Sequence, residues 1–333
     1  MKIGLPKGLL FYYYYPLWRP LFEGLGMEVA VSRPTNARLI DSGVKVSVPE
    51  ICVPIKAFSG HVIDLLKQGV DYCFIPRMVT IDRGNTFCPK FLGLPEMMEY
   101  TIPGLKGKLL SPVIKTNGED MARLKGYKTI WEALGVSKRS FKSALKEANM
   151  VWQSFRSYCR AGYRLDQATE LALGTKKESD FGKDAEYDVN IGVIGYVYNI
   201  YDSYISMDII NKLDTLGAGV RTFEMVDEDY INRKLDSLSK SLFWTFTNKL
   251  WGAADKYYKD DRIDGLIHVT AFNCGPDSML GKVLELDSDK YGKPFMTIRV
   301  DEHTGGNHLE TRIEAFVDMI RRKKTIFKGV DSL

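Results

Sequence analysis

The segment Gly265-Leu-Ile-His-Val-Thr-Ala-Phe272 contains no Lys, Arg, Asp or Glu and leads directly into Asn273-Cys-Gly-Pro-Asp277. A short, continuous apolar run of this kind is typical of a strand that is buried on both faces of a parallel sheet. We therefore expect a strand over 265–272. Cys274 then lies just beyond its carboxyl end, at the edge where doubly wound sheets bind their ligands.

The same kind of strand recurs along the chain and alternates with helical patterns. Besides 265–272, the predicted strands cover 2–5, 28–32, 71–76, 109–114, 190–195, 220–225 and 294–300. The predicted helices cover 9–25, 62–67, 121–134, 140–172, 206–216, 242–258, 278–286 and 309–322. Strands that alternate with helices imply right-handed crossovers and a mostly parallel sheet.

These patterns predict an α/β fold made of two doubly wound, Rossmann- or flavodoxin-like domains with a helical connecting segment. We place the N-terminal α/β domain, with Cys52 and Cys88, at residues 1–117. A helical connector and linker is expected over 118–188, and the C-terminal α/β domain, with Cys274, over 189–333. The length of 333 residues agrees with about two domains.

The composition excludes several classes of protein. The chain is 45% hydrophobic and 26% charged, as in ordinary globular proteins, and its 46 Lys and Arg against 42 Asp and Glu leave a charge of only +4. This small, evenly spread charge predicts no nucleic-acid partner. We see no secretory signal and no apolar run long enough to span a membrane. Together with an odd number of cysteines, five, this predicts a cytoplasmic protein in a reducing compartment.

Three of the cysteines are followed closely by proline, in Cys52-Val-Pro54, Cys88-Pro89 and Cys274-Gly-Pro276. Proline fixes the backbone near the sulfur, and Gly275 lets the backbone approach an inorganic group closely. Three thiolates cannot complete a zinc site alone, but they suit a [4Fe–4S] cluster with one iron left open. The spacing matches no compact metal motif, so ordinary buried cysteines remain an equal alternative. Cys73 and Cys159 fit that alternative well.

Three segments that contain these cysteines resemble one family: 49–56 (Pro-Glu-Ile-Cys-Val-Pro-Ile-Lys), 87–93 (Phe-Cys-Pro-Lys-Phe-Leu-Gly) and 268–277. They are similar to the 2-hydroxyacyl-CoA dehydratase family, and most similar to its single-chain branch of proteins related to the dehydratase activator. The opening 3–16 (Ile-Gly-Leu-Pro-Lys-Gly-Leu-Leu-Phe followed by four tyrosines and a proline) and Asp301-Glu-His-Thr-Gly305 resemble the same branch.

The resemblance implies that two α/β domains hold an iron–sulfur cluster through Cys52, Cys88 and Cys274, in a cleft between the domains. It also implies a partner, an ATPase activator with its own cluster, which delivers single electrons at very low potential. In the dehydratases the electron makes a ketyl radical from a 2-hydroxyacyl-CoA thioester. A related branch carries a double-cubane [8Fe–9S] cluster and reduces small unsaturated molecules.

Several alternatives stay open at this stage. The chain could be an oxygen-sensitive iron–sulfur dehydratase (a lyase) or an ATP-dependent reductase that works in an anaerobic setting. It could instead be a non-catalytic iron–sulfur electron carrier or activator-docking protein, or a plain α/β small-molecule binder. A double cubane needs about six thiolates, so it would have to be shared between chains. We expect a homodimer or a heterodimer.

Other residues near these motifs are candidates for binding or catalysis. Lys56 and Lys90, with Arg77, could offset the charge of a cluster or meet CoA phosphates, although solvated surface is an equal alternative. Glu302 and His303 follow the strand at 294–300, where a general acid or base is expected. The aromatic run 12–15 predicts packing at a domain or subunit interface. No Gly-x-x-x-x-Gly-Lys-Ser/Thr motif occurs, so we do not expect this chain to hydrolyse ATP itself.

Overall fold

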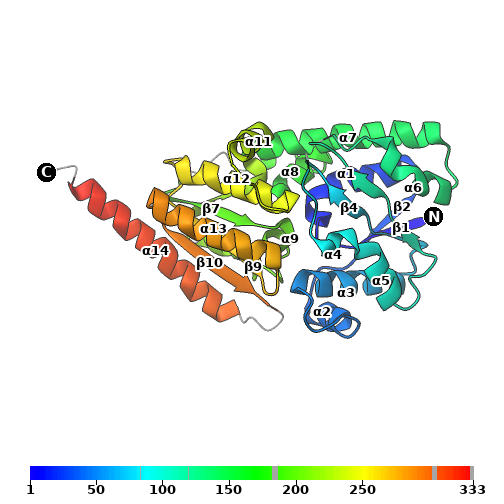
Figure 1. The fold of residues 1–333 in the computed structure, drawn as a ribbon, viewed down its shortest axis with the longest axis horizontal. Helices are drawn as coiled ribbons and strands as arrows, with labels where there is room; N and C mark the ends of the chain where they lie inside the picture. Colours follow the sequence, from blue (N-terminus) through cyan, green and yellow to red (C-terminus); the bar gives the residue numbers. More distant parts are fainter. Residues whose placement is uncertain (83, 119, 182–186, 302–305, 331–333) are drawn as a thin grey trace. The chain divides into compact units, whose positions relative to one another are not determined.

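The computed structural model describes residues 1–82, 84–118, 120–181, 187–301 and 306–330 (Figure 1). Its contacts divide the chain into two compact units. Unit 1 comprises Met1–Lys177 and Leu242–Phe246, and unit 2 comprises Glu178–Ser241 and Thr247–Leu333. The predicted domain boundaries near residues 117 and 188 stay a prediction.

Unit 1 is built on a parallel sheet with the strand order β2-β1-β3-β5. Its strands are β1 (Lys2–Leu5), β2 (Glu28–Val31), β3 (Tyr72–Phe74) and β5 (Leu109–Leu110). The order reverses at β1, as in a doubly wound sheet, and the α/β prediction is confirmed.

A second parallel pair joins β4 (Arg77–Thr80) to β6 (Val113–Lys115) in unit 1. The single strand that we predicted over 109–114 is therefore wrong, because the chain leaves β5 at Leu110 and enters β6 at Val113. Pro112 lies between the two strands, and proline cannot donate a hydrogen bond to a sheet ladder.

Aromatic packing holds the long helices of unit 1 together. The ring of Tyr13, on α1 (Phe11–Gly24), meets Trp152, on α7 (Lys138–Arg160), at 5.1 Å between centroids, and Tyr14 meets the same ring at 5.0 Å. Both tyrosines are buried inside unit 1. Tyr12 and Tyr15 are half-buried, and the interface packing that we expect for the run 12–15 stays a prediction.

The predicted helix over 140–172 is two helices. α7 ends at Arg160 and α8 (Leu165–Ala172) begins after a turn in which Gly162 has a φ of 99°. This left-handed conformation favours glycine and cannot continue an α-helix. Before α7, the chain forms a short 3-10 turn, Leu124–Tyr127, and α6 (Lys128–Ala133).

Two helices of unit 1 cross closely at glycines. α2 (Ala37–Val44) is capped by Asn36, whose side-chain oxygen accepts from the N–H of Leu39, and it packs on α3 (Val53–Lys67). A Cβ at Gly60 would collide with the backbone carbonyl of Leu39, and a Cβ at Gly43 would collide with that of Lys56. After β4 come α4 (Pro89–Leu92) and α5 (Leu94–Thr101).

Unit 2 has a parallel sheet with the strand order β10-β9-β7-β8. The strands are β7 (Val189–Gly195), β8 (Ala218–Thr222), β9 (Gly265–Ala271) and β10 (Phe295–Val300). Every residue of β9 is buried, which confirms the strand predicted from its apolar run. This sheet is also doubly wound, with the order reversing at β7.

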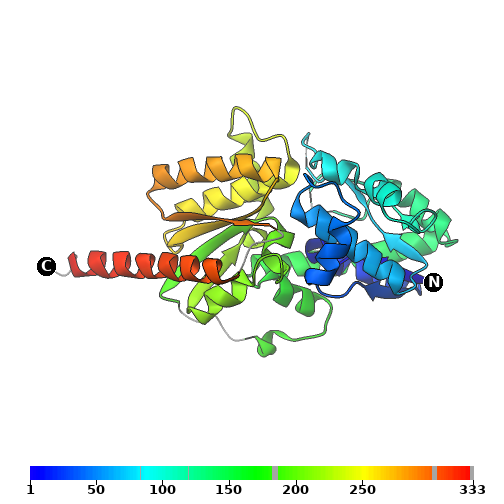
Figure 2. The same cartoon turned by 90° about the horizontal axis from the view of Figure 1, so that it is seen from below.

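Helices cover both faces of the unit 2 sheet. The helices are α9 (Val197–Tyr201), α10 (Ile209–Thr215), α11 (Glu228–Asp236), α12 (Thr245–Lys259), α13 (Gly275–Tyr291) and α14 (Gly306–Val330). Figure 2 shows α14, in red, on one face of the sheet and α13, in orange, on the other. Among the described residues, no helix is long and apolar enough to cross a membrane.

The close crossing of α2 and α3 predicts that Gly60→Ala lowers the free energy of unfolding by about 1 to 3 kcal/mol, because the new methyl group must push two backbones apart. Gly24→Ala is the matched control: a Cβ at this helical glycine would lie 3.5 Å from the Cβ of Ala144, an ordinary contact. We expect this variant to be as stable as the wild type, or more stable by up to about 1 kcal/mol. Urea unfolding measures both, and equal stability of the two variants would contradict the crossing.

Candidate functional site

The three proline-followed cysteines share one place in the local structure. Cys52, Cys88 and Cys274 are the N-cap residues of α3, α4 and α13, and each has an extended backbone conformation. Each helix has its proline in the first turn, where a missing N–H removes no helical hydrogen bond. The cysteine–proline spacing is therefore a helix-start motif.

An N-cap position suits a thiolate. The first N–H groups of a helix have no partner within the helix and carry a partial positive charge, which favours an anion beside them. Cysteines at helix N-termini accordingly have lowered pKa values and bind metals more readily. All three thiols are half-buried, and no disulfide joins any of the five cysteines.

Within unit 1, Cys52 and Cys88 act on one another. Burial raises the pKa of Cys52 to about 11, and the neighbouring Cys88 raises it further. The N–H of Ile55 and the charge of Lys90 oppose this rise. Burial also raises the pKa of Cys88, against the N–H groups of Phe91 and Lys90 and the charge of Lys90. The structure thus brings two thiols and one lysine into a common electrostatic environment.

In unit 2, Cys274 follows the carboxyl end of β9 at a sharp corner. Asn273, just before it, has a φ of 62°, in the left-handed region. A Cβ at Gly275 would meet no described atom within 4 Å, and its φ is not in that region. Among described residues other than its chain neighbours, nothing in the fold therefore requires glycine at 275.

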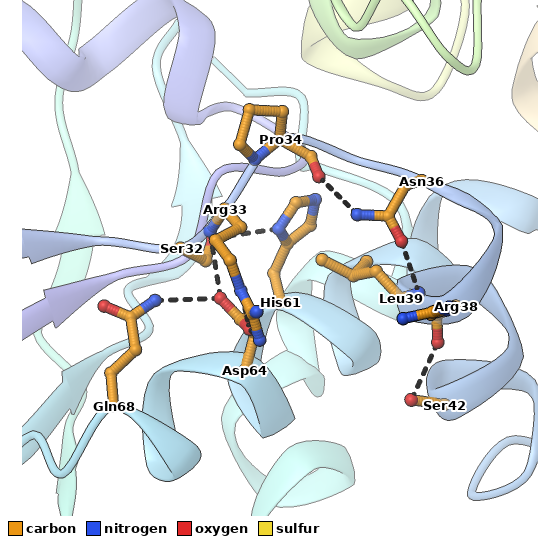
Figure 3. A network of polar contacts seen from close by, with 10 residues as sticks. All are labelled: Ser32, Arg33, Pro34, Asn36, Arg38, Leu39, Ser42, His61, Asp64 and Gln68. Carbon is orange, nitrogen blue, oxygen red and sulfur yellow. Dashed lines mark hydrogen bonds and ion pairs between the residues drawn. The ribbon is translucent and has the colours of Figure 1, made fainter.

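A buried histidine ties α3 to the carboxyl ends of β1 and β2 (Figure 3). His61 Nδ1 lies 2.8 Å from Ser32 Oγ, and Nε2 lies 3.0 Å from Thr35 Oγ1. Ser32 Oγ also accepts from the N–H of Lys7, in the loop after β1, at 2.8 Å. A neutral ring satisfies both contacts, with one nitrogen as donor and the other as acceptor. This network anchors the helix whose first turn carries Cys52.

An ion pair between Arg33 and Asp64 lies beside this histidine. Asp64 accepts from the Arg33 guanidinium at 2.7 Å and from the backbone N–H of Arg33 at 2.9 Å, and Gln68 donates to it at 2.8 Å. These three donors hold the pKa of Asp64 below its usual range, although burial opposes them. The carboxylate therefore stays charged and fixes the segment after β2 on α3.

An apolar pocket opens at the carboxyl edge of the unit 1 sheet. Its wall includes Leu9, Trp18, Phe58 and Phe91, all of which are buried. Phe91 lies three residues after Cys88 on α4. Along the helix axis, the two residues are therefore about 5 Å apart. With a volume of about 40 Å³, the pocket is far smaller than an ordinary ligand site and has room for a water-sized group only.

The remaining predicted residues have varied placements. Lys56 is buried in the first turn of α3, and Lys90 is exposed on α4. Arg77 donates to the carbonyl oxygen of Leu92 at 2.5 Å and pairs with Glu96, so it anchors α4 and α5. Glu302 and His303 lie outside the described residues. Cys73 and Cys159 are fully buried, as predicted.

Within each unit, the described residues include no group of three or more His, Cys, Asp or Glu side chains that could hold a metal ion. Unit 1 contributes the adjacent pair Cys52 and Cys88, and unit 2 contributes Cys274. Sequence reasoning did not identify Ser32 and Thr35 as the partners of His61. The start of α3 at Val53 could be predicted from Cys-Val-Pro, because proline favours the first turn of a helix. The partners of His61 could not, because they come from a loop almost thirty residues earlier.

Two family models match the chain. The CoA enzyme activase uncharacterised domain matches residues 2–226, which is more than half of the chain. The 2-hydroxyglutaryl-CoA dehydratase D-component matches residues 207–320. No curated protein matches. The first match contains Cys52 and Cys88, and the second contains Cys274.

The electrostatics of the thiol pair predict slow alkylation of Cys52 in the metal-free protein. With a pKa of about 11 in place of 9.0, the thiolate population at pH 8 falls about 100-fold, and the reaction with iodoacetamide slows accordingly. Lys90→Gln removes a charge that lowers this pKa, so we expect a further decrease. Lys106→Gln, at an exposed lysine elsewhere in unit 1, is the control. Peptide mass spectrometry measures the rates; a faster reaction in Lys90→Gln would contradict the assignment.

Burial lowers the pKa of His61 to about 4 from its usual 6.5, and Lys7 lowers it further against the effect of Asp64. The unfolded chain therefore takes up a proton at higher pH than the folded one, and stability falls as the pH drops from 6.5 to 4. A shift of this size amounts to about 3 kcal/mol.

We expect His61→Gln to flatten the dependence of unfolding free energy on pH in this window. Ser32→Ala, which keeps the titrating ring, should retain the dependence. Urea unfolding at a series of pH values compares the three proteins. An unchanged slope in His61→Gln would show that another group titrates.

Proposed function

The chain belongs to the 2-hydroxyacyl-CoA dehydratase family, and from this premise we propose that it is an iron–sulfur protein supplied with low-potential electrons by an ATP-dependent activator. The proposed acceptor is an acyl-CoA thioester or another small molecule that is hard to reduce. The observation that carries the proposal is the common placement of Cys52, Cys88 and Cys274 at proline-marked helix starts.

The donor set fits an iron–sulfur cluster. Thiolates are the ordinary ligands of such clusters. At neutral pH the buried thiols of Cys52 and Cys88 are protonated, and bound iron would displace their protons. The open space at Gly275 is consistent with a bulky inorganic group near Cys274. When bound, a [4Fe–4S] cluster supplies the ability to take up and release single electrons.

The protein's own residues would prepare the site. Lys90 offsets negative charge at the thiol pair, and Lys56 is a second candidate for this role on α3. Glu302 and His303, after β10, are the candidates for moving a proton.

An activator partner is supported by two observations. One matching family model is described as a CoA enzyme activase domain, and the other as a dehydratase component. The sequence contains no P-loop, so ATP hydrolysis would be the work of the partner.

A non-catalytic electron carrier of the same family is the second candidate. The described residues include the three thiols, whereas Glu302 and His303, the candidates for moving a proton, lie outside them. A double cubane shared between two chains is the third. Dehydration of an acyl-CoA panel in the presence of activator, ATP and reductant separates an enzyme from a carrier.

The proposal predicts about four iron atoms per chain after anaerobic purification, or about eight for a double cubane. Cys52→Ser, Cys88→Ser and Cys274→Ser should each lose most of this iron, because each removes a ligand. Iron and sulfide analysis with absorption near 400 nm measures the loss.

Cys73→Ser is the matched control, since Cys73 is fully buried in β3 and should leave the iron content unchanged. Gly275→Ala tests the space beside Cys274: it should lower the iron content without lowering the free energy of unfolding. Iron content equal to wild type in all three serine variants would overturn the proposal.

A further inference from the structure

We propose that His268 and Asp277 are positioning residues that set the direction of the Cys274 thiol. The inference rests on the proposed function, because it takes Cys274 as a ligand. His268 Nε2 lies 2.9 Å from Asp277 Oδ1, and both side chains are fully buried. His268 belongs to β9 and Asp277 is the third residue of α13. The pair therefore joins the strand before Cys274 to the helix after it.

Stability alone does not account for this pair. Neither His268 Nδ1 nor Asp277 Oδ2 has a hydrogen-bond partner among the described residues, so the bond between the two side chains satisfies two of their four polar atoms. Replacing a buried polar pair by apolar side chains is often neutral or stabilising. What the pair contributes is a fixed geometry, since a hydrogen bond is directional and apolar contact is not.

The corner that carries Cys274 needs such a restraint. Asn273 has the left-handed φ of 62°, a conformation that asparagine adopts more readily than most residues other than glycine, and Phe272 is more than half exposed. Backbone bonds link Cys274 N to Ala271 O at 3.2 Å and Ser278 N to Cys274 O at 2.9 Å. These bonds hold the ends of the corner to their own elements, whereas the His268–Asp277 bond ties those elements together.

Gly281, on α13, provides room for the imidazole. A Cβ at this position would come within 3.1 Å of His268 Nδ1 and 3.2 Å of Cε1. Glycine within a helix is unfavourable compared with alanine, so its presence here agrees with a need to seat the ring. Gly281→Ala accordingly displaces the ring without removing either partner of the hydrogen bond.

The test measures alkylation of Cys274 by iodoacetamide in the metal-free full chain, followed by peptide mass spectrometry, with Cys52 in the same sample as the internal reference. We expect His268→Leu to raise the Cys274 rate about tenfold, the change that a loss of 1.4 kcal/mol of restraint produces. His268→Gln, which keeps a donor for Asp277, should restore a rate near that of the wild type. Gly281→Ala should lie between the two.

A rate for Cys274 in both His268→Leu and Gly281→Ala that is within twofold of wild type would overturn the proposal. If His268→Leu does not fold, Gly281→Ala and Asp277→Asn decide the question. Because these rates are measured without metal, they stand apart from the proposed function, which fails if the anaerobic wild type contains no iron. Where iron is bound, its loss to a chelator should be faster in Gly281→Ala than in the wild type.

Discussion

The structure depends on the interaction between a helix N-terminus and the residue that caps it. At three places a cysteine takes the N-cap position, and a proline within the next two residues fixes the first turn. In unit 1, first-turn N–H groups accordingly lower the pKa of the two thiols: that of Ile55 acts on Cys52, and those of Phe91 and Lys90 act on Cys88.

Burial works against this helix-end charge in unit 1. Desolvation of Cys52 and Cys88 favours their neutral forms, and each thiolate would repel the other. The nearby amides and Lys90 compensate only in part. In the proposed cluster, bound iron would replace the protons of this pair. The hydrogen bonds of His61 hold α3, and with it Cys52, against the strand ends.

Much of the architecture could be predicted from the sequence. The apolar runs at 190–195 and 265–272 became β7 and β9, because short uncharged runs rich in β-branched residues are typical of strands buried on both faces of a parallel sheet. The strand at 109–114 and the helix at 140–172 were predicted as continuous and are interrupted. In the first case Pro112 lies at the break, and in the second Gly162 adopts a left-handed turn, which are local effects that hydrophobic periodicity does not register.

The sequence alone determined the α/β class, the three proline-followed cysteines and the placement of Cys274 at a strand end, because these depend on near neighbours in the chain. Only the tertiary structure decided that Cys52 and Cys88 share a charge environment, that Ser32 meets His61, and that His268 meets Asp277. The first two contacts join segments about thirty residues apart. The third joins β9 to the following helix, α13, and depends on the side chains of His268 and Asp277 pointing toward each other. Such contacts follow from how whole elements pack, which no local pattern encodes.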